Sequence, residues 1–194
     1  MKKLVYVVIT LFIAFLFTGC GNTQPYPETV KSWKSHEDVA KWMKSNWSMD
    51  NSTRLRLVRN IKKMRSSGAD MSTITAASIS MLPEESYNKA KGHCADAAVL
   101  IKDSLNKINP EYNAKIIFIM NVYGPPNHWV TGFYIKDELY IMDFGAGKHW
   151  SDMMGIHGPY KSLDGYATFL ENVDAKNFKL DFVEWRDYSQ SYSN

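Results

Sequence analysis

The sequence predicts an α+β fold in which a group of helices precedes an antiparallel sheet. Two observations lead to this prediction: apolar residues recur at helical spacing before residue 109, and strand-like runs joined by short turns follow from residue 114. With 194 residues, of which 45% are hydrophobic and 22% charged, the chain has the size and composition of one globular domain with a short appendage. The formal net charge of +3 is too small to indicate a particular class of partner.

The first twenty residues predict an export signal. Lys2 and Lys3 precede an uncharged apolar stretch that is shorter than the ~20 residues a membrane-spanning helix requires. The segment Phe17-Thr18-Gly19-Cys20 then resembles the lipobox of bacterial lipoproteins. The resemblance implies cleavage before Cys20 and a diacylglycerol on its thiol, whereas the alternative is an uncleaved anchor with an incidental cysteine.

These observations divide the chain into three parts. We expect a lipoprotein signal peptide over residues 1–19, a lipidated tether over residues 20–32, and one domain over residues 33–194. The tether prediction rests on Pro25, Pro27 and the scarcity of apolar residues around them.

The helical part begins with a capping pattern at Ser35, where acidic residues follow in the first turn. A second helix is predicted from about Ser52 to Arg65. A third begins near Pro83, and the segment between Met71 and Met81 is ambiguous. The second helix has an apolar face and a basic face, for which a solvated surface is the default and contact with anionic lipid the alternative. The apolar face contains Leu57, Val58, Ile61 and Met64, and the basic face contains Arg56, Arg59, Lys62 and Lys63.

A fourth helix is predicted from Cys94 to the stop at Asn109-Pro110, because its apolar stripe begins at the cysteine. Strands are then predicted over residues 114–121, 128–135, 138–144 and 178–185, with a glycine-rich loop over 145–160 and a short helix over 163–172. Lys136-Asp137 forms a tight hairpin turn. Its two-residue length places Asp143 opposite Val130, as a diagonal neighbour of His128.

The chain contains only two cysteines, which excludes a disulfide-rich scaffold and a four-cysteine zinc site. If Cys20 carries lipid, Cys94 is a free thiol in a compartment that oxidises exposed thiols. The start of a helix favours a thiolate at Cys94, and the same backbone amides can hold an oxyanion. The alternative is a buried structural cysteine.

His128 and Asp143 complete a set of groups suited to covalent acyl chemistry. His128 begins a strand, a position where a histidine is usually a polar edge residue. Asp143 ends the next strand after an apolar run, where an unpaired charge would be costly to bury. A carboxylate there can fix the imidazole tautomer and stabilise imidazolium, so a nucleophile, a base and an orienting acid come from three elements.

The segments Gly92-His93-Cys94-Ala95-Asp96-Ala97-Ala98, His128-Trp129-Val130 and Tyr140-Ile141-Met142-Asp143 together resemble the transglutaminase-like superfamily. This resemblance implies a papain-like core in which Cys94 is the nucleophile, His128 the general base and acid, and Asp143 the orienting carboxylate. It also implies a structural role for Asp96, which would tie its helix to neighbouring loops.

The chain departs in one place from the bacterial transglutaminase-like cysteine proteinases, which have a calcium-binding Asp before the cysteine. His93 occupies that position here, so the sequence gives no support for calcium control. The Cys/His hydrolases that trim peptidoglycan usually have Asp before and Ser-Gly after their cysteine, and this chain lacks that pattern.

Four other residues are weaker candidates. Asn88 could donate a hydrogen bond to the oxyanion, although a surface helix asparagine is the plainer interpretation. His93 could perturb Cys94 but is expected to be a loop residue. His149 and His157 could line the rim of a substrate cleft, and since no third ligand stands at metal spacing, we expect no metal and no cofactor.

The sequence therefore favours a lipid-anchored cysteine peptidase, amidase or acyl transferase of the bacterial cell envelope. Its partners would be the membrane, through lipid on Cys20, and an envelope protein or peptide substrate; nucleic acid is not expected. The lipid would lie in the outer membrane facing the periplasm, or on the outer face of the cell membrane. The alternative is a non-enzymatic lipoprotein that uses the same fold for protein binding.

Overall fold

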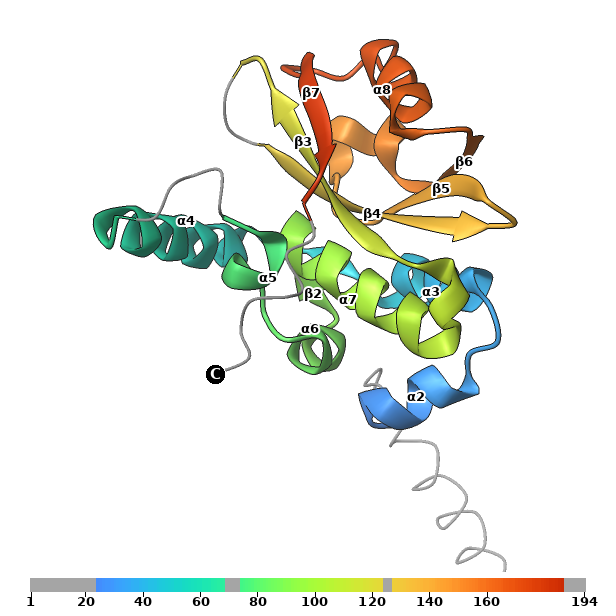
Figure 1. Ribbon diagram of the computed structural model, residues 1–194. Coiled ribbons are helices and arrows are strands. Elements are labelled where there is room, and N and C mark those ends of the chain that lie inside the picture. Colours follow the sequence, from blue (N-terminus) through green and yellow to red (C-terminus); the bar gives the residue numbers. More distant parts are fainter. Residues whose placement is uncertain (1–23, 69–73, 124–126, 187–194) are drawn as a thin grey trace, which may run out of the picture.

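The computed structural model describes residues 24–68, 74–123 and 127–186. The α+β prediction is confirmed, because helices precede an antiparallel sheet of five strands in the order β6-β5-β4-β3-β7 (Figure 1). The strands of this sheet are β3 (Lys115–Asn121), β4 (His128–Ile135), β5 (Glu138–Asp143), β6 (Gly155–Tyr160) and β7 (Leu180–Trp185). Two further short strands, β1 (Ser48–Met49) and β2 (Lys91–Gly92), pair in parallel away from that sheet.

The predicted helices are present, and the ambiguous segment before residue 81 contains one helical turn. The helices are α2 (Tyr26–Ser32), α3 (His36–Asn46), α4 (Asn51–Ser66), α5 (Ala76–Ile79), α6 (Pro83–Lys89), α7 (Cys94–Ile108) and α8 (Leu163–Glu171). Two 3-10 segments, η2 (Pro110–Tyr112) and η3 (Lys148–Met153), connect larger elements.

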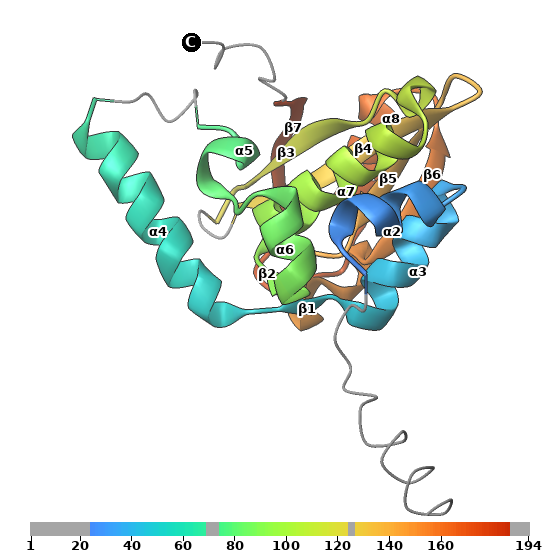
Figure 2. The same ribbon diagram turned by 90° about the horizontal axis from the view of Figure 1, so that it is seen from below.

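Helices cover both faces of the sheet. Helix α7 lies across one face with α2, α3 and α6 packed around it, and α8 and η3 lie on the other face (Figures 1 and 2). Successive side chains of β4 point to opposite faces of the sheet. Trp129 and Phe133 pack toward α7, and Val130 packs toward α8 and η3. Thr131 fixes the contact with α7 by donating a hydrogen bond to the backbone oxygen of Ala98 at 2.8 Å.

The predicted register of the β4–β5 hairpin is confirmed. Ile135 pairs with Glu138 and Thr131 with Met142, so that Lys136 and Asp137 alone form the turn. Both turn residues have positive φ, at 50° and 65°, as the favoured two-residue hairpin turn requires.

The tether prediction is wrong for residues 26–32, which form helix α2 and pack onto the domain. Tyr26 and Val30 lie one helical turn apart and are both buried. The Tyr26 hydroxyl donates to Asp103 at 2.6 Å and lies 3.0 Å from the Ser104 hydroxyl. Pro27 is compatible with this helix, because proline in the first turn of a helix is well tolerated.

The loop prediction for residues 145–160 is wrong at its second half, which forms strand β6 on the edge of the sheet. An edge strand needs hydrogen bonds on one side only, and so it tolerates Pro159 and the positive φ of Gly155 and Gly158. The first half contains the 3-10 segment η3.

Within the described ranges, no helix is both long enough and apolar enough to cross a membrane. The predicted signal peptide and Cys20 lie outside the described residues.

The packing of α2 predicts that Tyr26→Ala destabilises the domain. Removal of a buried aromatic ring should lower the free energy of unfolding by about 3–5 kcal/mol in urea denaturation. Tyr26→Phe keeps the ring and should cost about 1 kcal/mol through its lost hydrogen bonds. Glu28→Ala, at an exposed position of the same helix, is the matched control. If Tyr26→Ala were as stable as this control, α2 would be the tether that the sequence suggested.

Candidate functional site

The three residues with the strongest chemical signal lie at one end of the sheet, where β4 begins, β5 ends and α7 starts. Nε2 of His128 lies 2.6 Å from Oδ2 of Asp143. Cys94 is the first residue of α7, and its thiol interacts electrostatically with His128. All three are almost completely buried, with exposed fractions of 2% for Cys94, 2% for His128 and 1% for Asp143.

Asp143 has both carboxylate oxygens engaged. Oδ2 accepts from His128, and Oδ1 accepts from the backbone N–H of Gly145 at 2.7 Å. Because an ionised carboxylate can only accept, Nε2 of His128 carries the proton. In the neutral ring Nδ1 is then the unprotonated nitrogen, which is the one that can act as a base.

The electrostatics of the site favour a thiolate–imidazolium pair. Burial alone would raise the pKa of the Cys94 thiol, but the charge of His93 and hydrogen bonds to His128 and His93 lower it to about 6. Burial would likewise lower the pKa of His128, but the charge and hydrogen bond of Asp143, together with Cys94, raise it to about 10. Between these two values the thiol is ionised and the imidazole is protonated.

His93 contributes more than the sequence interpretation allowed. Its Nδ1 lies 3.0 Å from the sulfur of Cys94, so the thiol interacts with this imidazole as well as with that of His128. Burial would lower the pKa of His93, but the charge of the Cys94 thiolate and its hydrogen bond raise it. The sequence signal was the adjacency of the two residues, which does not by itself determine where the ring points.

Asp96 has the structural role that the family resemblance implied. Its buried carboxylate accepts hydrogen bonds from three donors. These are the guanidinium of Arg56 at 2.7 and 2.9 Å, the backbone N–H of Met81 at 2.7 Å, and the backbone N–H of His93 at 2.8 Å. Arg56 therefore does not belong to a solvated basic face, because its guanidinium points inward to this ion pair. The last of these bonds fixes the residue immediately before Cys94.

Gly145, which the sequence did not suggest, and Trp150 also shape the site. A Cβ atom at Gly145 would lie 2.5 Å from Cα of Cys94, so only glycine lets the end of β5 approach the start of α7 this closely. The Trp150 ring packs edge-on against the imidazole of His128, with centroids 5.5 Å apart. Gly132 on β4 makes room for the side chains of Ile117 and Trp185.

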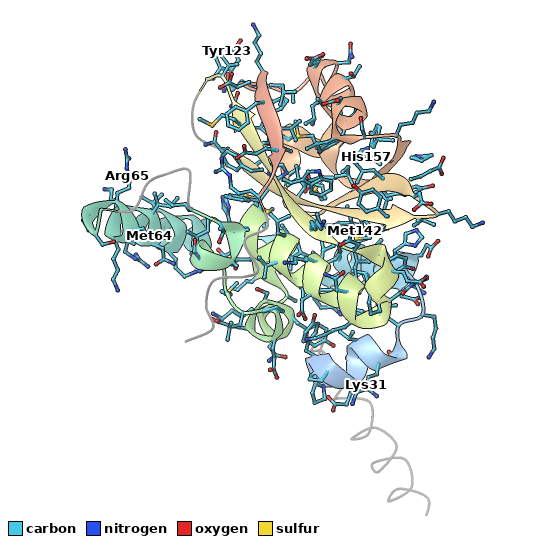
Figure 3. The ribbon with its side chains drawn as sticks, in the orientation of Figure 1. Lys31, Met64, Arg65, Tyr123, Met142 and His157 are labelled. Atoms are coloured by element: carbon cyan, nitrogen blue, oxygen red, sulfur yellow. The ribbon has the colours of Figure 1, made fainter. Side chains whose placement is uncertain are left out.

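Asn88 and His157, two of the other weaker candidates, have different surroundings. Asn88 follows the buried Ser86 and Tyr87 on α6 and is exposed, as expected of a surface helix asparagine. His157 lies on β6, where Nε2 is 2.8 Å from the carbonyl oxygen of Met153 and the ring packs on Phe169 (Figure 3). The side chain of His149 lies outside the described residues.

Among the side chains that the structure describes, no group of three His, Cys, Asp or Glu residues is arranged to hold a metal ion. The groups present at the site are a polarised thiol, a base held in one tautomer, and backbone amides at a helix start. Neither a comparison with models of known protein families nor a search of curated proteins finds a match for this chain.

The contact at Gly145 predicts that Gly145→Ala disturbs the site. The added methyl group meets backbone and cannot be accommodated by a rotamer change, so we expect a loss of about 1–3 kcal/mol in the free energy of unfolding. We also expect slower alkylation of Cys94 by iodoacetamide, followed by peptide mass spectrometry. Gly165→Ala is the control, because a Cβ there would meet Tyr160 at an ordinary 3.5 Å. Equal behaviour of the two variants would contradict this interpretation of the close contact.

Proposed function

We propose that the chain is a lipid-anchored cysteine hydrolase or acyl transferase of the bacterial cell envelope, with Cys94 as nucleophile. The observation that carries the proposal is the 2.6 Å bond between His128 and Asp143 beside a cysteine that begins a helix. A histidine oriented by a carboxylate and hydrogen-bonded to a thiol is the arrangement of a nucleophile activated by an adjacent base.

The proposed first step is attack of the Cys94 thiolate on the carbonyl carbon of a peptide or amide. A C–S bond forms and the C–N bond breaks, while the imidazolium of His128 gives its proton to the leaving amine. Backbone N–H groups in the first turn of α7 would stabilise the oxyanion of the tetrahedral intermediate. The products of this step are a thioester on Cys94, a free amine and neutral His128.

The second step returns the enzyme to its starting state. His128 takes a proton from water, whose oxygen attacks the thioester; a C–O bond forms and the C–S bond breaks. The thiolate and the imidazolium are thereby restored, and a carboxylic acid is released. A lysine amine in place of water would give an amide and a cross-linked product by the same proton transfers.

The family assignment and the location remain part of the proposal. The order of Cys94, His128 and Asp143 along the chain, and their placement on a helix and two neighbouring strands, support a transglutaminase-like protein with a papain-like core. The lipobox-like sequence before Cys20 supports lipid anchoring.

A second function, protein binding without catalysis, is favoured by one observation. The sulfur-bearing residue and its partner His128 are each only 2% exposed, so a substrate carbonyl would need the covering side chains to move. A buried cysteine can also have a purely structural role, as a small apolar residue of the hydrophobic core. Reactivity of the thiol distinguishes the two functions.

The first prediction from this proposal concerns the pH dependence of that reactivity. Because the pKa of Cys94 is lowered to about 6, the thiolate is present above that pH and absent below it. The rate of Cys94 alkylation by iodoacetamide should rise with a midpoint near pH 6, rather than near the ~8.5 of an ordinary thiol.

Variants identify the groups that lower this midpoint. His128→Asn and His93→Asn should each move it upward, whereas His157→Asn, which removes an imidazole from outside the site, should leave it unchanged. A wild-type midpoint near that of a free thiol contradicts the activated cysteine. Absence of alkylation at every pH in folded protein favours the binding function.

The second prediction concerns labelling by a peptide vinyl sulfone, which reacts with activated cysteines. Cys94→Ala should abolish labelling while the unfolding midpoint in urea stays close to that of the wild type. His128→Ala should slow labelling by roughly a hundredfold or more, the usual contribution of a general base. Equal labelling of His128→Ala and wild type would contradict the triad. Comparison of envelope protein fragments from wild-type and Cys94→Ala cells then identifies the substrate.

A further inference from the structure

Helix α4 carries an exposed face that the proposed catalysis does not use. The helix stands at the periphery of the domain, apart from α7 and the sheet (Figures 1 and 2). Its inner face is held by Ile61 and Met64, which pack against the cluster around α5 and α7, and by Arg56, which also donates to the carbonyl oxygen of Ile79 at 3.0 Å. The described side chains of the opposite face are exposed.

The exposed face combines apolar and basic side chains. Leu55 and Val58 are 64% and 40% exposed, although the sequence pattern placed Val58 on the buried side. Arg59 and Lys62 follow Leu55 by four and seven residues and so share its side of the helix. Lys63 and Arg65 flank this strip and are also exposed, and Arg65 extends from the outer end of α4 in Figure 3. No acidic residue occurs in the sequence of α4.

We propose that this face of α4 lies on an anionic phospholipid surface, with Leu55 and Val58 inserted between headgroups and Arg59, Lys62, Lys63 and Arg65 on phosphates. Because the charged residues of this face are all basic, a partner with complementary charge is negatively charged. The two exposed apolar side chains favour lipid over nucleic acid or an acidic protein segment, because a polyanion without an apolar phase offers them no environment. Long basic side chains beside an apolar strip are suited to the interface, since their stems lie on lipid while their charges reach the headgroups.

The position of α4 is compatible with a weak attachment to the membrane, in addition to the predicted lipid on Cys20. A helix at the periphery can lie flat on a surface without displacing any core residue. The predicted lipid on Cys20 would hold the chain near the membrane, so that α4 needs little affinity of its own. The proposal does not depend on the chemistry of Cys94, and its test involves no catalytic residue.

The test measures the chemical accessibility of lysines in the full chain on vesicles. The chain is reconstituted into vesicles of phosphatidylcholine alone, or of two parts phosphatidylcholine to one part phosphatidylglycerol, and flotation establishes that it is bound to both. Brief acetylation followed by mass spectrometry gives the rate at each lysine. Lys179, exposed next to β7 and remote from α4 in the sequence, is the internal control.

We expect Lys62 and Lys63 to be acetylated roughly fivefold more slowly on the anionic vesicles, a change of the order that one basic group at an anionic surface produces. Lys179 should react equally on both vesicles. High salt should remove most of the protection, because the attraction is electrostatic. Equal rates at Lys62 and Lys63 on the two vesicles would overturn the proposal.

Variants separate insertion from charge alone. The double change Leu55→Ser and Val58→Ser should reduce the protection on anionic vesicles, as should Arg59→Gln with Arg65→Gln. Lys41→Gln with Lys44→Gln removes the same charge from the exposed side of α3 and should leave the protection intact. If soluble poly-glutamate protects Lys62 and Lys63 as well as the vesicles do, and the serine variant is unaffected, the face binds acidic polymers and the lipid assignment is wrong.

Discussion

The buried carboxylate of Asp96 is the constraint on which the helical half of the domain depends. A charge in this position is tolerated only because it is fully paired and hydrogen-bonded. Its donors come from three separate segments: Arg56 from α4, the backbone of Met81 from the connection before α6, and the backbone of His93 from the residue before α7. The direction in which α7 leaves the preceding chain, and hence the position of Cys94, follows from this one group.

A second buried carboxylate plays the corresponding part on the side of the sheet. Asp143 accepts from the ring of His128 and from the backbone of Gly145, so it fixes both the imidazole and the chain that leaves β5. The absence of a side chain at Gly145 then lets that chain touch the backbone of Cys94. The thiol therefore lies between a helix start fixed by one carboxylate and a strand end fixed by the other. This double constraint would hold the proposed nucleophile and its base in a fixed geometry.

Helix α4 connects the two proposals made above. Its inner side supplies Arg56 to the ion pair beneath the start of α7, and its outer side presents the basic and apolar face that we assign to lipid. A helix with one side committed to a buried charge is held in a fixed orientation. The exposed face consequently has a defined direction relative to the body of the domain, as a surface that contacts a flat membrane requires.

The sequence alone determined those features that depend on neighbours along the chain. The cap at Ser35 and the turn at Lys136-Asp137 involve residues within one turn of helix or one hairpin, and the turn length set the register that places Asp143 near His128. Only the tertiary structure decided the burial of Tyr26, the inward direction of Arg56 and the contact of His93 with the sulfur of Cys94. These outcomes depend on packing between distant segments, such as Arg56 and Asp96, which are 40 residues apart. Helical periodicity in the sequence assigns a residue to a face of its helix. Which segment covers that face depends on the tertiary packing of the whole domain.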